Sequence, residues 1–152
     1  DYISGRDERL IDLFFLPNDN AQVLRLLRKQ EPDGALSTVY PVKLLEDETQ
    51  EPDKTIPAYL REFIADFKEE HLRYDVSPEN VLSWMYYDYM MKADNQLVKR
   101  YAEFSMNLKN LVTALNARKY GMEVAKEVGI SQAQVSRLEK NALKVMRQYL
   151  ES

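Results

Sequence analysis

The chain has 152 residues, of which 45% are hydrophobic and 30% charged, and it contains no cysteine. These proportions are typical of a soluble globular protein, and the lack of cysteine excludes disulfides, thiolate zinc sites and a cysteine nucleophile. The net charge of -4 is uneven, because residues 1–118 carry 21 acidic and 15 basic side chains whereas residues 119–152 carry four and six. An acidic body is not typical of a general polyanion binder. Any contact with nucleic acid is therefore expected in the C-terminal segment.

No segment has the run of roughly 18 apolar residues that a membrane-spanning helix requires, and the first residues lack the character of a signal peptide. We therefore expect a cytoplasmic protein that does not span a membrane. Because the chain begins with Asp rather than Met, we expect it to be a piece of a longer natural protein or an engineered chain. Only four glycines occur, so few turns can depend on glycine and the helices should be long.

The first half of the chain is predicted to contain two helices and a long loop. One helix covers residues 7–16, a polar segment at residues 17–20 breaks it, and Asn18 or Asp19 caps the next helix. Residues 31–54 contain three prolines and seven acids, so we expect a solvated loop with one helical turn. The acidic cluster in this loop lacks the glycine and terminal glutamate of a calcium-binding EF-hand loop, and no metal site is predicted.

The second half is predicted to be almost entirely helical. A helix begins at Pro57 and runs to about Arg73, and a serine cap followed by proline at residues 77–78 starts the next one. Residues 81–118 contain neither proline nor glycine, although residues 93–95 allow a break. Six apolar side chains then recur every four and three residues, a heptad-like stripe on one helix face: Leu97, Tyr101, Phe104, Leu108, Leu111 and Leu115. The expected fold is an all-α helical bundle built round one long central helix.

An aromatic cluster, Trp84, Tyr86, Tyr87 and Tyr89, places rings on every side of this helix. Such a helix must be covered on more than one face, either as a buried central helix or by a partner protein. The candidate partner-binding residues are Trp84, Tyr87 and Tyr101.

The residues that carry enzyme chemistry are missing or isolated. His71 is the only histidine and lies beside two glutamates, no nucleophile elbow precedes any serine, and no glycine-rich phosphate loop occurs. A lone histidine without cysteines does not make a zinc site. We therefore predict that the protein is not an enzyme and has no catalytic residue, no cofactor, no metal and no small-molecule substrate.

The C-terminal segment, residues 119–152, has the pattern of a helix-turn-helix or of a helical hairpin packed on the body at residues 1–118. Ala125 is the small residue of the first helix, Gly129 allows the left-handed turn, and Ser131 caps the second helix. In a DNA-reading helix, glutamine and arginine suit base edges while serine and lysine reach phosphates. The candidate DNA-binding residues are Gln132, Gln134, Ser136, Arg137 and Lys140.

Residues 7–128 resemble the bacterial C-subunit-like proteins of the V-type ATPase, a helical family related to the central stalk. Three blocks carry the resemblance: LIDLFFLPNDNAQVLRLLRKQ at residues 10–30, IPAYLREFIADF at 56–67 and LSWMYYDYMMKADNQLVKRYAEFSMNLKNLVTALNARKYGMEVA at 82–125. The resemblance implies a non-catalytic protein that links the rotor to the membrane ring in proton transport, with other ATPase subunits as partners. It also implies a location peripheral to the membrane through that complex.

From Met122 onward the chain resembles a different family. MEVAKEVGISQAQVSRLEKNALKVMRQYL, residues 122–150, is similar to the helix-turn-helix in the fourth conserved region of sporulation-type sigma factors, which implies binding to promoter-like DNA. The two resemblances meet within residues 119–129, as in a chimera that is a natural fusion, an engineered protein or a designed sequence. Three hypotheses follow, in this order: a coupling protein of the ATPase stalk, a folded helical scaffold with neither activity, and a DNA-binding module.

Overall fold

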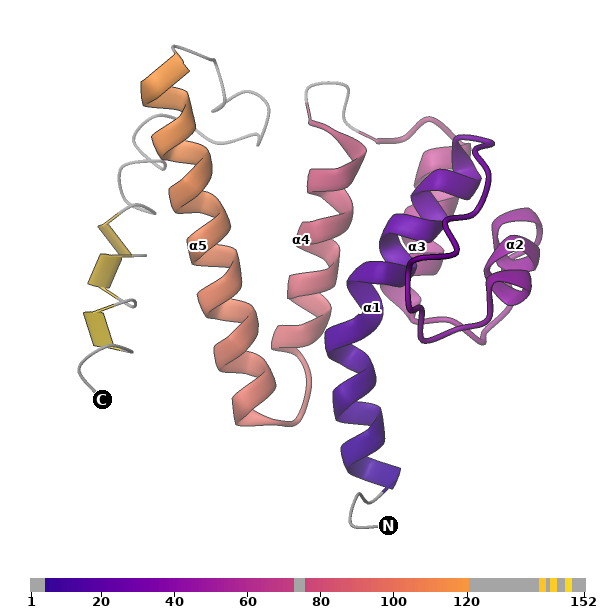
Figure 1. Ribbon diagram of the computed structural model, residues 1–152, viewed down its shortest axis with the longest axis horizontal. Coiled ribbons are helices and arrows are strands. Elements are labelled where there is room, and N and C mark those ends of the chain that lie inside the picture. Colours follow the sequence, from indigo (N-terminus) through magenta and orange to yellow (C-terminus); the bar gives the residue numbers. More distant parts are fainter. Residues whose placement is uncertain (1–4, 73–75, 121–139, 142, 145–146, 149–152) are drawn as a thin grey trace. The chain divides into compact units, whose positions relative to one another are not determined.

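The computed structural model describes residues 5–72, 76–120, 140–141, 143–144 and 147–148. Within these residues the regular secondary structure is helical (Figure 1), which confirms the predicted all-α class. No helix in this part of the chain is long and apolar enough to cross a membrane. The elements are α1 (Gly5–Leu27), α2 (Val42–Gln50), α3 (Ala58–Lys68), α4 (Pro78–Met91) and α5 (Gln96–Tyr120).

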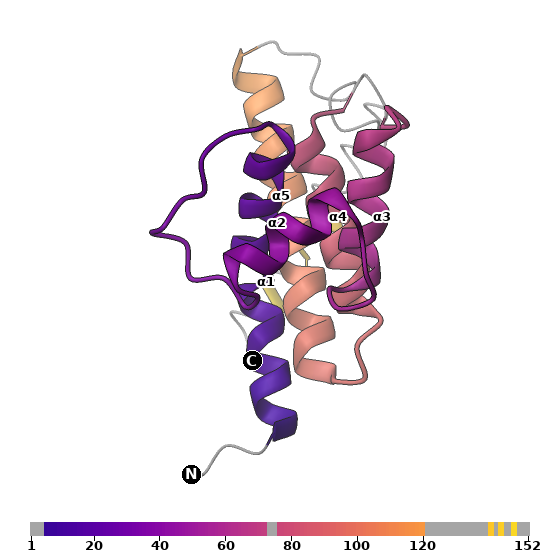
Figure 2. The same cartoon turned by 90° about the vertical axis from the view of Figure 1, so that its right-hand side faces the viewer.

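The chain divides into two compact units. The first unit comprises Asp1–Leu72 and Val81–Tyr86, and the second comprises Arg73–Asn80 and Tyr87–Ser152. In the first unit, α1 packs against both α2 and α3 (Figure 2). The predicted boundary at residue 118 adjoins residues outside the described part of the chain, so the division into body and C-terminal segment stays a prediction.

The predicted break at residues 17–20 is wrong, because α1 continues through Pro17 as one helix of 23 residues. A proline inside a helix has no N–H to donate to the carbonyl four residues earlier, which here belongs to Leu13. The hydroxyl of Tyr86 donates to the Leu13 carbonyl oxygen over 2.8 Å. Tyr86 is buried, so a donor from α4 replaces the one that Pro17 lacks.

The polar side chains after Pro17 do not cap a second helix. The Asp19 carboxylate is fully buried and accepts hydrogen bonds from the backbone N–H groups of Val39 (2.8 Å) and Tyr40 (3.0 Å). Burial raises the pKa of the Asp19 carboxyl group, and these backbone hydrogen bonds offset part of that rise. One turn on, Gln22 accepts the N–H of Asp33 through its side-chain oxygen. These bonds hold the segment between α1 and α2 against α1.

Two further amides in this part of α1 also bind distant segments. Asn18 donates from its side chain to the carbonyl of Ser37 over 2.9 Å. The side-chain oxygen of Asn20 accepts the hydroxyl of Tyr59, on α3, over 2.6 Å in a buried setting. The polar run is therefore the surface by which α1 holds the following loop and α3.

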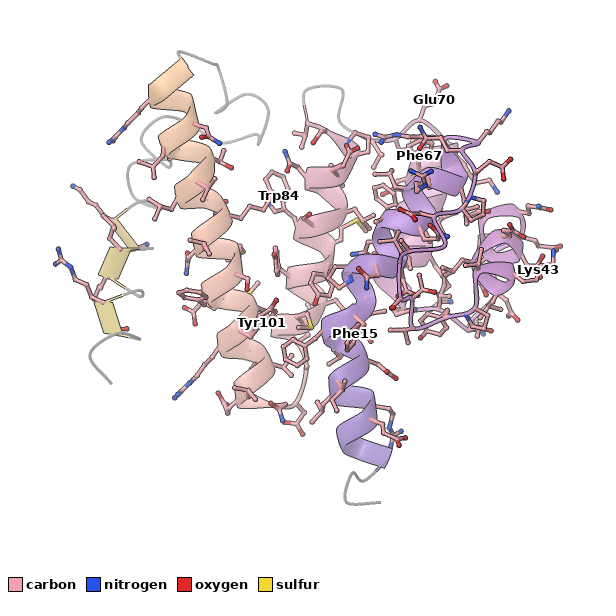
Figure 3. The ribbon with its side chains drawn as sticks, viewed as in Figure 1. Phe15, Lys43, Phe67, Glu70, Trp84 and Tyr101 are labelled. Carbon is pink, nitrogen blue, oxygen red and sulfur yellow. The ribbon has the colours of Figure 1, made fainter. Side chains whose placement is uncertain are left out.

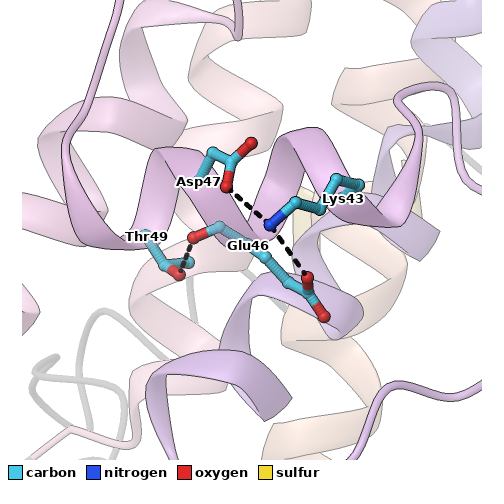
Figure 4. Close-up of polar contacts among 4 residues, drawn as sticks. All are labelled: Lys43, Glu46, Asp47 and Thr49. Atoms are coloured by element: carbon cyan, nitrogen blue, oxygen red, sulfur yellow. Dashed lines mark hydrogen bonds and ion pairs between the residues drawn. The ribbon is translucent and has the colours of Figure 1, made fainter.

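Residues 31–54 contain more helix than predicted, because α2 occupies nine of them. Leu45 is fully buried and Glu48, one turn on, is almost so. The Glu48 carboxylate accepts the N–H of Asp53 over 2.9 Å. On the exposed side, Lys43 pairs with Asp47 over 3.0 Å and the Thr49 hydroxyl donates to the Glu46 carbonyl (Figure 4). Exposed ion pairs of this kind contribute little to the stability of a helix. Burial of the face that carries Leu45 is therefore the main reason that α2 forms.

The third helix begins close to the predicted Pro57 but ends earlier than residue 73. Its buried side chains, Tyr59, Leu60, Phe63 and Ile64, form one face. The helix ends at Lys68, and Glu70 takes a left-handed conformation with φ 57°. The N–H of His71 then bonds to the Asp66 carbonyl over 2.9 Å, a closure that stops a helix.

The start of α4 is as predicted. The expected long central helix is instead two helices, α4 and α5, because the break that residues 93–95 allow is present. The Ser77 side chain accepts the N–H of Asn80, and proline occupies the first turn. α4 ends at Met91, and the Asn95 side-chain oxygen accepts the N–H of Val98 to open α5. In the second unit the described buried apolar side chains are Val76, Met90, Val98, Ala102, Leu111 and Ala114.

The replacement of a missing helical donor by Tyr86 gives a testable coupling. Tyr86→Phe should lower the free energy of unfolding by about 1–2 kcal/mol, because the Leu13 carbonyl loses its donor. In a Pro17→Ala background the restored N–H can serve that carbonyl, and the same change should cost less than about 0.5 kcal/mol. Urea unfolding of the four proteins measures both costs. If Tyr86→Phe lowers the free energy of unfolding equally in both backgrounds, the Tyr86 hydroxyl does not replace the donor that Pro17 lacks.

The Asp19 contact gives a second prediction. In Asp19→Asn the amide N–H₂ would face a backbone N–H, so the free energy of unfolding should fall by about 1–3 kcal/mol. Because the folded-state pKa of Asp19 is raised, its stabilising contribution should be largest in acid and shrink as pH rises through that pKa. Urea unfolding at acid and neutral pH measures the cost, with Glu8→Gln as an exposed control on α1. A cost that grows with pH would contradict this account.

Candidate partner-binding surface

One face of α5 exposes a row of large apolar side chains. They are Leu97, Tyr101, Leu108, Val112 and Leu115, with exposed fractions between 37% and 71%. At roughly 100° per residue they lie within a sector of roughly 60°, and at ~1.5 Å per residue the row is roughly 27 Å long. Tyr101 is labelled near one end of this row in Figure 3. We call these five residues the α5 apolar face. Contiguous exposed apolar side chains of this kind mark interaction sites.

The predicted heptad-like stripe only partly coincides with this face. Leu97, Tyr101, Leu108 and Leu115 belong to both, whereas Leu111 is 7% exposed and packs in the second unit. Three further apolar side chains of α5, Val98, Ala102 and Ala114, are also buried. The predicted stripe omitted Val112, although its position four residues after Leu108 places it on the same face.

Basic side chains border the α5 apolar face. Measured round the helix from the middle of that face at about 100° per residue, Arg100 and Arg118 lie about 80° to one side and Lys109 about 100° to the other. Glu103, the only acid of α5, lies about 140° away. The charged side chains that α5 itself places round this face are therefore mainly basic.

Lys109 has an unusual environment for a surface lysine. It is half-buried, and burial lowers the pKa of its ammonium group. Among the described residues no carboxylate lies within ion-pair distance of it. A carboxylate from outside would stabilise this charge.

The predicted partner-binding residues lie in both units. Trp84 is half-buried on α4 and belongs to the first unit. Tyr87 and Tyr101 belong to the second unit, where Tyr87 is half-buried and Tyr101 is exposed. Burial, and secondarily the electrostatic influence of Tyr101, raises the pKa of the Tyr87 hydroxyl. The structure thus brings Tyr87 close to the α5 apolar face, and a partner-binding role for the three residues stays a prediction.

Four of the predicted DNA-binding residues, Gln132, Gln134, Ser136 and Arg137, lie outside the described residues, and the fifth, Lys140, is exposed. His71 is exposed, with its Nδ1 atom 3.2 Å from Glu69 Oε2. Within the described residues no group of three or more His, Asp or Glu side chains is placed to hold a metal ion.

A groove of about 920 Å³ lies in the first unit where α1, α2 and α3 end. Its apolar floor includes the half-buried Leu26, Leu27 and Phe67, and its rim includes Glu70; Phe67 and Glu70 are labelled in Figure 3. Lys68, also on the rim, donates to the Gln50 carbonyl over 2.9 Å. Both acidic and basic side chains line this groove. Its charge therefore favours no particular partner, in contrast to the mainly basic border of the α5 apolar face.

Comparison with known proteins identifies one family and one short local similarity. The family described as "Protein of unknown function (DUF2764)" matches residues 1–146. A segment of 29 residues is 76% identical to the RNA polymerase sigma-G factor of Clostridium acetobutylicum. This segment covers 19% of the chain and 11% of the sigma factor, and it supports the predicted sigma-factor-like segment. No solved structure is significantly similar to the chain.

Proposed function

We propose that this chain, which belongs to the DUF2764 family, is a non-catalytic protein that works through protein–protein contacts. The observation that carries the proposal is the α5 apolar face, an exposed row of five large apolar side chains on one helix. An amphipathic face of this kind is used to pack against a helix or a groove of another protein. Leaving it in water has no structural benefit for the chain alone.

The finer proposal is a structural or coupling role like that of the C-subunit in the central stalk of the V-type ATPase. It rests on the resemblance of residues 7–128 to the C-subunit-like proteins. In this proposal the partners are other ATPase subunits, and the chain lies peripheral to the membrane through their complex.

The absence of catalysis is part of the same proposal. A general acid or base is normally held in a pocket that tunes its pKa. The only histidine, His71, is instead exposed beside Glu69. The buried carboxylate of Asp19 is occupied by two backbone N–H groups, which supports a structural role for that group.

Co-purification with the central-stalk subunits of a bacterial V-type ATPase tests the proposal. Leu108→Glu places a charge in the α5 apolar face and should reduce recovery of the stalk subunits at least about tenfold, as expected for the centre of an interface. Glu103→Gln, on the opposite side of α5, is the matched control and should leave recovery unchanged. Both side chains are exposed, so each change should alter the free energy of unfolding by no more than about 0.5 kcal/mol.

Two results would contradict the proposal. If the wild-type chain recovers none of the stalk subunits, the ATPase assignment fails. If Leu108→Glu and Glu103→Gln recover the same amount as the wild type, the α5 apolar face is not the binding surface.

We propose sequence-selective DNA binding by the C-terminal segment as the alternative function. The observation that favours it is the 76% identity to the sigma-G factor over 29 residues. The candidate contacts are Gln132, Gln134, Ser136, Arg137 and Lys140. The segment has a net charge of only +2, so affinity should be weak, in the range of roughly 1 µM to 0.1 mM at physiological salt.

Fluorescence anisotropy with a labelled promoter-like duplex and a scrambled duplex tests this alternative. Selective binding should weaken on Arg137→Ala or Gln134→Ala, because either change removes a contact to a base edge worth about 1–3 kcal/mol. Equal affinity for the two duplexes, or no binding at low salt, would exclude sequence-selective DNA binding.

A further inference from the structure

We propose that the α5 apolar face binds an acidic amphipathic helix of a partner protein. The inference rests on the proposed function and adds to it the chemical class of the partner. It follows from the length of the face, from the charges that border it and from the environment of Lys109.

The length of the face fits a helix. The row from Leu97 to Leu115 runs roughly 27 Å along one side of α5, which is the length of a partner helix of about 18 residues. Its spacings of four, seven, four and three residues match the positions that a facing helix fills by knobs-into-holes packing. A narrow row of side chains along one helix is less suited to an extended peptide, which needs pockets or a sheet edge.

The charged side chains that border the face favour a partner of opposite charge. Arg100 and Arg118 lie on one side of the row and Lys109 on the other, while the only acid of α5 is on the far side. Carboxylates that flank the apolar side chains of a partner helix would meet these cations, in the manner of the flanking pairs of a coiled coil. A partner with lysine at the same positions would meet like charges.

Lys109 contributes an independent argument. Its ammonium group is half-buried beside the row and has no carboxylate of the described residues within ion-pair distance. A partly desolvated cation without a counter-charge is unfavourable. An acidic partner helix would supply a counter-charge that the described residues do not provide.

A second copy of the chain fits this face less well. Two α5 helices packed together would place basic borders against each other. The first unit does expose an acidic apolar strip on α1, made by Ile11 and Phe15 with Glu8 and Asp12; Phe15 is labelled in Figure 3. That strip is only roughly 10 Å long, so it would cover less than half of the row.

Binding of two synthetic helical peptides to the full chain tests the inference. Each has about 21 residues, three heptads with leucine at the apolar positions, and the two differ only in glutamate or lysine at the flanking positions. At low salt the glutamate peptide should bind at least about tenfold more tightly than the lysine peptide, and salt near 0.5 M should reduce this preference to about twofold. The double variant Arg100→Glu, Arg118→Glu should reverse the preference. Leu108→Glu should abolish binding of both peptides, and Glu103→Gln should change neither.

The outcomes separate this inference from the proposed function. If both peptides bind equally and both are lost in Leu108→Glu, the α5 apolar face binds helices but the acidic preference is wrong. If neither peptide binds while Leu108→Glu still loses the stalk subunits, the function stands and the helical partner is wrong. Sedimentation could instead show concentration-dependent dimerisation that Leu108→Glu abolishes. In that case the α5 apolar face binds a second copy of the chain and the proposed partner helix is wrong. Tight, salt-sensitive and selective binding of the glutamate peptide is the result that supports the inference.

Discussion

The buried carboxylate of Asp19 is the contact on which the arrangement of the first unit depends. A buried carboxyl group is tolerated only where hydrogen bonds are fixed around it, and here the backbone N–H groups of Val39 and Tyr40 provide them. Those residues closely precede α2, so the position of α2 on α1 follows from this contact. Asn20 holds α3 in a similar way, because its side-chain oxygen accepts a hydrogen bond from the Tyr59 hydroxyl. A short polar run inside one helix thus positions two others.

This arrangement explains which parts of the fold could be predicted. The Ser77 cap and the start of α3 after Pro57 depend on residues a few positions apart, and both were predictable from the sequence. The continuity of α1 depends on Tyr86, 73 residues from the carbonyl it serves. A proline followed by polar residues is ordinarily a helix break, because nothing nearby in the sequence supplies the missing donor. The α2 helix was missed for a similar reason, since its stability comes from burial of Leu45 against other elements.

For the α5 apolar face, the sequence pattern predicts which residues share a side of the helix but not which of them are exposed. Periodicity located a face of α5, because apolar residues three and four positions apart must share one side of a helix. It could not say which part of that stripe is covered, since coverage depends on what packs against the helix. Leu111 is buried while Leu108, one turn away, is exposed. The small residues Ala102 and Ala114 mark the covered side, where close packing favours short side chains, and they carry little signal in a hydrophobic pattern. Exposure of the larger apolar residues is therefore the information that only the structure adds.

The extent of the family match bears on the two proposed surfaces. It runs to residue 146, so it includes most of the segment at residues 122–150 that resembles a sigma factor. A match that crosses the expected junction at residues 119–129 favours one continuous family sequence over two joined pieces. In the chain, α5 ends at Tyr120 and the sigma-like segment follows at once. The identity covers only 11% of the sigma-G factor, and helix-turn-helix patterns of this size also occur as pairs of packed helices. Because the α5 apolar face and this segment are neighbours along the chain, loss of protein binding and loss of DNA binding must be measured on the same variants to assign either function.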